Sequence, residues 1–182
     1  MSVAAWVDGD PIDVADVEAR LGRLRSRYRA SALPADGTRE GRQLRRWVAQ
    51  VAVVERLCER ELRMRGTDPE PRLAGEYVPT RANAAALGSI VAAAWANSPA
   101  VALVAEIVTR DARLSAEASA RAARLGAGAD GIPVWSEDDL LRSARMEAFA
   151  RWLACATHQR VRLEAGFEHP GDAEQPDNLH EH

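Results

Sequence analysis

Apolar residues recur at helical spacing in several separate stretches of the chain. The longest pattern runs from about residue 38 to residue 65, where one apolar stripe with charged positions elsewhere predicts a long amphipathic helix. Gly66 follows it directly, as is typical after a helix C-terminus. The stripe contains Leu44, Trp47, Val48, Val51, Val54, Cys58 and Leu62.

The N-terminal stretch has a different pattern. Apolar residues 3–7, the turn residues Asp8-Gly9 and then Pro11-Ile12 predict a short strand, a tight turn and a return strand. Asp13 is the expected N-cap of the first helix, which has an apolar face at spacings of three and four. That face contains Val14, Val17, Leu21 and Leu24.

Start signals predict four further helices in the second half, one of which is a short helix from Ser115 to the Gly126-Ala127-Gly128 stretch. Thr80 is the expected cap of an alanine-rich helix to residue 96, and Ser98-Pro99 is typical of the start of the next helix, which extends to about residue 109. Ser136, with Asp139 three residues later, predicts the start of a long helix to about residue 158. Residues 161–164 are expected to be extended, with the N-terminal strand as the candidate partner.

These patterns predict a mainly α fold, an orthogonal bundle of five to six helices with a minor N-terminal β-hairpin. We expect one helical domain over residues 1–166 and an acidic tail with proline and histidine over residues 167–182. The 38–65 and 136–158 helices should share one core, because an amphipathic helix is not stable alone. Val51 and Leu153 should lie in that core, with Trp47 and Trp152 largely buried.

Composition narrows the class of protein. The 182 residues are 47% hydrophobic and 28% charged with a net charge of −3, which suits a soluble globular domain and argues against a disordered or collagen-like chain. All 24 basic residues are arginine, a bias typical of GC-rich genomes such as those of actinobacteria. Without a signal peptide or an apolar run of about 18 residues, we expect a cytoplasmic protein that neither enters nor binds a membrane.

Two groups of residues resemble a known family. Residues 6–12, Trp-Val-Asp-Gly-Asp-Pro-Ile, followed by the helix containing residues 17–21, resemble the start of SurA-like, parvulin-associated chaperone modules. The chain is also similar to short actinobacterial proteins labelled peptidylprolyl isomerase-like, some of which are found beside polyketide pathways. The C-terminal residues 166–172, 175–178 and 180–182 resemble the end of those proteins.

The resemblance implies a helical module without its enzyme domain. SurA-like chaperones insert a parvulin domain of roughly ninety residues between their helices, whereas only residues 111–133 are available here. The resemblance therefore implies a non-catalytic module that binds polypeptide or hydrophobic surfaces and lacks prolyl isomerase activity. The alternative is a small accessory or tailoring enzyme of aromatic polyketide biosynthesis with a hydrophobic pocket. The sequence does not decide between a monomer and a homodimer.

Two sets of residues are candidates for binding. Large aromatic rings among small residues fill a core or line a cavity for a hydrophobic small molecule. Residues 23–46 have a net charge of +6 and the 167–182 tail has −5, so the arginines are a solvated face, a contact for the tail, or a dock for an acidic acyl carrier protein. The pocket candidates are Trp6, Trp47, Trp95 and Trp152, and the arginine patch contains Arg23, Arg27, Arg39, Arg42 and Arg46.

The tail also contains potential metal ligands. His169, Asp177, His180 and His182 offer imidazole and carboxylate groups suited to zinc, iron or copper. Their spacing is not that of a rigid helical site, so a tail without a metal is the simpler interpretation and we expect no cofactor.

Standard catalytic patterns are missing from the sequence. It has no Gly-x-Ser-x-Gly elbow and no glycine-rich phosphate loop, which argues against an acyltransferase and against nucleotide binding. Nucleic-acid binding is not expected of an acidic chain. Cys58 and Cys155 are expected to be small core residues, and a Cys155–His158 pair is the alternative.

Overall fold

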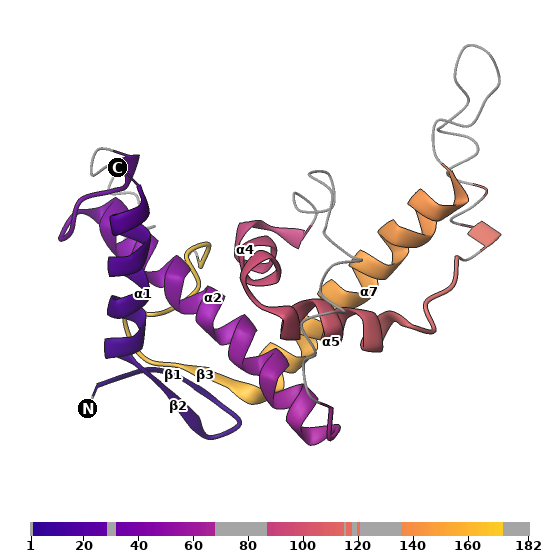
Figure 1. Ribbon diagram of the computed structural model, residues 1–182, viewed down its shortest axis with the longest axis horizontal. Coiled ribbons are helices and arrows are strands. Elements are labelled where there is room, and N and C mark those ends of the chain that lie inside the picture. Colours follow the sequence, from indigo (N-terminus) through magenta and orange to yellow (C-terminus); the bar gives the residue numbers. More distant parts are fainter. Residues whose placement is uncertain are drawn as a thin grey trace, which may run out of the picture.

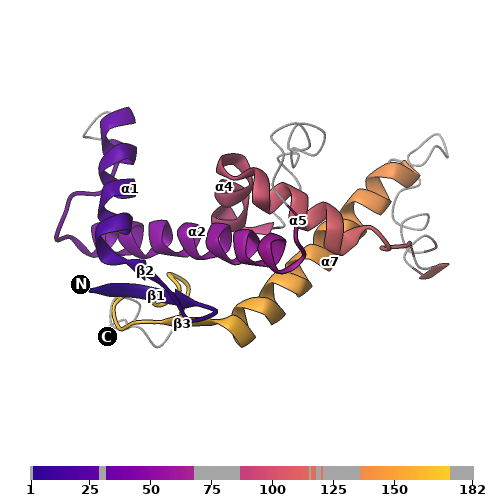
Figure 2. The same cartoon turned by 60° about the horizontal axis from the view of Figure 1, so that its bottom comes forward.

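The described part of the chain forms five helices and one small sheet (Figures 1 and 2). The computed structural model describes residues 2–28, 32–67, 87–114, 116–117, 120 and 136–172. The helices are α1 (Val14–Arg27), α2 (Arg39–Met64), α4 (Ser89–Asn97), α5 (Pro99–Thr109) and α7 (Glu137–Arg160). The strands are β1 (Val3–Val7), β2 (Asp10–Asp13) and β3 (Val161–Leu163). The predicted mainly α fold with a minor N-terminal β element is confirmed.

The sheet joins the N-terminal hairpin to the segment that follows α7. Its order is β2-β1-β3, both pairs are antiparallel, and Val7 lies opposite Asp10 on one side and Val161 on the other. Asp8 and Gly9 have φ angles of 51° and 81°, the positive values that a tight two-residue hairpin turn needs. The expected pairing of residues 161–164 with the first strand is confirmed.

Two of the described helices begin at a side-chain cap, whereas the predicted N-cap Asp13 makes no capping hydrogen bond through its side chain. The Thr38 side chain accepts a hydrogen bond from the Gly41 N–H at 3.0 Å, and Ser136 and Asp139 form a reciprocal capping box at the start of α7. The predicted helix over 80–96 is wrong in its extent: α4 begins only at Ser89, because Gly88 has a φ of 82° and interrupts the helical backbone. Residues 80–86 lie outside the described residues.

One core joins all these elements. Helix α2 runs through its middle, with α1, α4 and α5 packed against it and α7 against α5 (Figure 2). Val51 and Leu153 belong to the same buried cluster, as predicted, together with the fully buried Leu57 and Phe149. Trp47 and Trp152 are partly buried residues that pack against this cluster.

The two cysteines have different environments. Cys58 is buried in α2, and burial raises the pKa of its thiol to about 12, as expected for a core residue. Cys155 is exposed on α7, so its predicted core position is wrong. The structure shows no hydrogen bond between Cys155 and the exposed His158, although both are described.

The length and hydropathy of each described helix indicate whether it could span a membrane. None of them is by itself long and apolar enough to cross a bilayer. The pair α4 and α5 reaches that length only together, and the two helices meet at a bend of 110°.

Candidate binding groove

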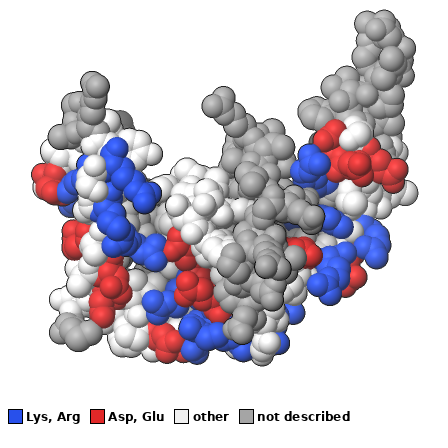
Figure 3. Space-filling model, in the orientation of Figure 1, with Lys and Arg blue, Asp and Glu red and all other residues white. Residues whose placement is uncertain are grey.

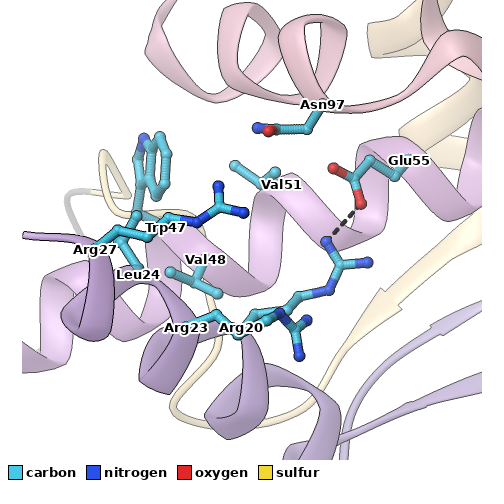
Figure 4. Close-up of a pocket in the computed structure, with 9 residues that line it drawn as sticks. All are labelled: Arg20, Arg23, Leu24, Arg27, Trp47, Val48, Val51, Glu55 and Asn97. Carbon is cyan, nitrogen blue, oxygen red and sulfur yellow. Dashed lines mark hydrogen bonds and ion pairs between the residues drawn. The ribbon is translucent and has the colours of Figure 1, made fainter.

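A groove lies where α1, α2 and α4 meet, and Figure 4 shows its lining. Its volume is about 360 Å³. Helix α1 supplies one wall, α2 supplies the floor, and the last residue of α4 reaches in from the other side. The lining residues are Arg20, Arg23, Leu24, Arg27, Trp47, Val48, Val51, Glu55 and Asn97.

The α1 wall contains three arginines because positions 20, 23 and 27 share one face of a helix at spacings of three and four. Arg20 donates to the Glu55 carboxylate at 2.5 Å, so the charge of that buried acid is paired. Arg23 and Arg27 are exposed, and neither forms an ion pair with any described residue. The groove therefore has a net positive wall.

The floor of the groove is apolar, and a hydrogen bond orients the tryptophan ring at its edge. Val48 and Val51 are only 5% and 6% exposed, so little apolar area remains open there, whereas the Trp47 ring is partly exposed. The Trp47 indole N–H donates to the Ser89 hydroxyl at 3.1 Å, which links the ring to the start of α4. The groove thus offers one aromatic surface with a fixed orientation.

The groups that line the groove are suited to binding a ligand. Among the described residues that line the groove, none is a serine, threonine, cysteine, histidine or lysine that could serve as a nucleophile. Glu55 is the one carboxylate in the described lining, and it accepts a hydrogen bond from Arg20. A ligand in the groove could contact guanidinium, carboxamide and indole groups.

The fold divides the arginine patch that the sequence suggested. Arg23 and Arg27 lie at the groove, whereas Arg39 and Arg42 are exposed at the start of α2. Arg46 is buried, and its Nε lies 3.7 Å from a carboxylate oxygen of Glu168. Figure 3 shows positive side chains gathered along α1 and facing the largely uncharged surface over α4.

The first residues of the predicted tail pack against the other side of α2. Phe167 is buried, its carbonyl oxygen accepts from the Gln50 amide at 2.9 Å, and the Arg45 guanidinium lies 4.6 Å from its ring centre. The Glu168 contact with Arg46 continues this attachment. Phe167 and Glu168 therefore attach the start of the tail to α2.

The proposed metal ligands are only partly described. His169 is exposed, and its Nδ1 accepts a hydrogen bond from the Gly171 N–H at 3.0 Å. Asp177, His180 and His182 lie outside the described residues. Within the described ranges no group of three or more His, Cys, Asp or Glu side chains could hold a metal ion.

The four candidate tryptophans do not share one cavity. Trp6, Trp47 and Trp95 line three different cavities, of about 380, 360 and 110 Å³. Trp95 is buried edge-on against Phe149, and Trp152 stacks on the other side of Phe149 at 5.8 Å. Core packing explains Trp95 and Trp152, and only Trp47 lies in the arginine-walled groove.

Sequence reasoning missed an ion-pair cluster at the hairpin turn. Arg160, the last residue of α7, donates to both oxygens of Asp8 at 2.7–3.2 Å and to Glu61 at 2.6 Å. Arg60 adds an ion pair to Asp10 at 2.8 Å, and Arg65 donates to Glu61 at 2.7 Å. No sequence motif predicts this cluster, because its residues come from three segments that are far apart in the sequence.

The cluster lowers the pKa of its carboxyl groups. The hydrogen bonds from Arg160 lower the pKa of Asp8 below its ordinary value. Burial alone would raise the pKa of Glu61, but the hydrogen bonds from Arg65 and Arg160 outweigh it and lower that pKa as well. Both acids are therefore charged at neutral pH, as a structural ion-pair network requires.

Comparison with known proteins gives one partial match. Residues 3–40 are similar to a family of unknown function, DUF7158. The match covers the hairpin, α1 and the start of α2, including all three arginines of the groove wall. No curated protein and no solved structure matches the chain significantly.

Proposed function

We propose that this protein is a non-catalytic binding module that holds an extended polypeptide segment in the groove between α1, α2 and α4. The observation that carries the proposal is the groove itself, which has a partly exposed indole, an apolar floor and a polar wall. A peptide needs all three, because its backbone stays polar while its side chains bury apolar area.

Two further observations support a binding role. The N-terminal hairpin and the helix after it resemble SurA-like chaperone modules, and the similarity to DUF7158 covers the same region. Among the described residues that line the groove, none is a serine, threonine, cysteine, histidine or lysine. Most of the 111–133 segment, where a parvulin domain would be inserted, lies outside the described residues, and we propose that the module has no isomerase activity.

The proposal is tested by blocking the groove from its rim. Asn97 lines the groove and is exposed, so Asn97→Trp should fill it without disturbing the core. The neighbouring Ala96 is also exposed but does not line the groove, which makes Ala96→Trp a matched control. Binding is measured by fluorescence anisotropy of labelled twelve-residue peptides. Together, the overlapping sequences of these peptides cover a protein that is unfolded when its disulfides are reduced.

We expect Asn97→Trp to weaken binding of the bound peptides by about tenfold, and Ala96→Trp to leave it unchanged. Circular dichroism and thermal melts should show the same fold in both variants. If no peptide binds the wild-type protein, or if both variants bind equally well, the groove is not a polypeptide site.

The alternative of a polyketide tailoring enzyme predicts a different result. Such an enzyme should retain or bind a flat hydrophobic small molecule, which native mass spectrometry of the purified protein detects directly. The cavities of about 360 and 380 Å³ beside Trp47 and Trp6 are large enough for such a ligand, whereas the cavity of about 110 Å³ next to Trp95 is small for it. We favour the binding module because the groove combines charged, apolar and aromatic groups, and the unpaired cysteines fit the proposed cytoplasmic location.

A further inference from the structure

We propose that the groove selects acidic polypeptide segments in which two carboxylate side chains at alternate positions accompany an apolar side chain. This inference rests on the proposed function and names the class of partner that the groove takes. It is carried by the charges of the α1 wall, by their spacing, and by the position of Trp47.

The first argument is the unequal pairing of the wall arginines. Arg20 is neutralised by Glu55, and other arginines of this region also have acids: Arg25 pairs with Asp36, and Arg45 pairs with Glu18 at 2.5 Å. Arg23 and Arg27 form no ion pair with a described residue although they line the groove. A carboxylate arriving from a ligand would be their complement.

The second argument is spacing. Arg23 and Arg27 lie four residues apart on α1, which places them about 6 Å apart along the helix axis. Alternate side chains on one side of an extended strand are separated by about 6.6–6.8 Å. Two acids at positions i and i+2 of an extended peptide therefore match the spacing of these two positions on α1, whereas adjacent acids point to opposite sides.

The third argument is the partly exposed indole of Trp47. Trp47 offers a partly exposed apolar surface in the groove, and its hydrogen bond to Ser89 orients the ring. An apolar ligand side chain gains contact there, while the valine floor is already nearly closed. Charge alone is therefore insufficient, and the ligand needs both an acidic pair and an apolar residue.

The acidic tail of this same chain is a less suitable occupant. Successive residues of a helix turn by about 100°, so positions 45, 46 and 50 of α2 lie on the side opposite to positions 47, 48 and 51. The tail begins on the first of these sides, where Gln50 and Arg46 hold residues 167 and 168. The groove is on the other side, so we assign it to a segment of another chain.

The test compares labelled peptides that differ only in the central motif. The motif Asp-Leu-Asp is compared with the uncharged Asn-Leu-Asn, with Asp-Ala-Asp and with the adjacent pair Asp-Asp-Leu. Each is titrated with the full-length protein, with Arg23→Glu/Arg27→Glu, and with the control Arg63→Glu/Arg151→Glu. The control changes net charge equally at exposed positions that do not line the groove.

We expect the wild-type protein and the control to bind Asp-Leu-Asp about tenfold more tightly than each of the other three peptides. The Arg23→Glu/Arg27→Glu variant should lose that preference. This preference should also decrease as the salt concentration rises, because salt screens the attraction between exposed charges; the Debye length is about 10 Å at 0.1 M ionic strength.

Other outcomes overturn the inference in distinguishable ways. If all four peptides bind equally and the groove variant behaves like the control, the groove binds polypeptide without acidic selectivity. If none binds and the overlapping peptides also fail, the proposed function is wrong as well. If Glu174→Gln/Asp177→Asn/Glu181→Gln in the full chain raises the affinity about tenfold, the tail is the resident occupant and our assignment is wrong.

Discussion

At the scale of single residues, Arg160 has the most connected side chain described in this protein. Its guanidinium joins Asp8 in the hairpin turn to Glu61 near the end of α2, and its backbone carbonyl accepts from the Asp8 N–H at 2.9 Å. The side chains of Arg160, Asp8 and Glu61 are only 15%, 21% and 10% exposed. Charged hydrogen bonds in such a partly buried setting stabilise more than surface pairs do.

This cluster predicts a loss of stability in acid. Because the folded state lowers the pKa of Asp8, its stabilising contribution is present above the ordinary value of 3.8 and is lost as the pH falls below it. We expect Asp8→Asn to reduce the free energy of unfolding at neutral pH by about 1–3 kcal/mol and to flatten its fall between pH 5 and about pH 3. Urea unfolding at several pH values measures both effects.

The control for this prediction is Asp111→Asn. Asp111 is exposed and has no ion pair with a described residue. Its substitution should leave the pH dependence of the wild-type protein intact. Parallel stability curves for wild type and Asp8→Asn would show that the cluster contributes nothing to acid sensitivity.

At the scale of elements, the start of α7 shows how far local sequence determines structure. Ser136 accepts from the Asp139 N–H at 3.1 Å, and the Asp139 carboxylate accepts from the Ser136 N–H at 3.2 Å. The Ser136 hydroxyl also donates to the Asp139 carboxylate at 2.7 Å, and this bond together with the one from the Ser136 N–H lowers the pKa of Asp139. The same two residues identified this helix start from the sequence, because a cap depends only on residues three positions apart.

We expect Ser136→Ala to destabilise the protein by about 0.5–2 kcal/mol, because it removes the acceptor of the capping box. Ser143→Ala is the matched control within α7, where an exposed serine has no capping role and alanine favours the helix. Thermal melts of both variants measure the difference. Equal destabilisation by the two substitutions would contradict a specific role of the cap.

Other elements show where local reasoning fails. Gly88 interrupts the alanine-rich stretch that predicted one helix over 80–96, because an apolar pattern does not reveal a positive φ at one glycine. The arginines between 23 and 46 looked like one patch in the sequence. Helices α1 and α2 place Arg27 at the groove and bury Arg46 against the tail segment, and this separation depends on how the two helices pack.

At the scale of the whole molecule, the two ends of the described chain hold the body together. Strand β3 pairs with β1, the Glu164 N–H donates to the Ala4 carbonyl at 3.0 Å, and Phe167 continues into a site on α2. The strand pairing was predicted from an apolar segment after α7. The Phe167 site was not, because nothing in the sequence shows that Gln50 is turned toward it.

We expect Phe167→Ala to lower the free energy of unfolding by about 3–5 kcal/mol, since it deletes a ring that is 5% exposed and under a guanidinium. Glu168→Gln should cost only about 0–1 kcal/mol, because its pairing with Arg46 is long and partly exposed. Hydrogen exchange should show that Phe167→Ala also loses protection over residues 164–172. A loss below about 1 kcal/mol would show that this segment does not brace the fold.

The β1–β3 pairing has a consequence for synthesis on the ribosome. Trp6 lies opposite Arg162, so β1 receives its second neighbour only after more than 150 further residues have been made. At cellular elongation rates of about 5–20 residues per second, that interval is roughly 10–30 s. Throughout it, one edge of β1 is open to pairing with another nascent chain, and a product released before residue 161 would keep that edge exposed.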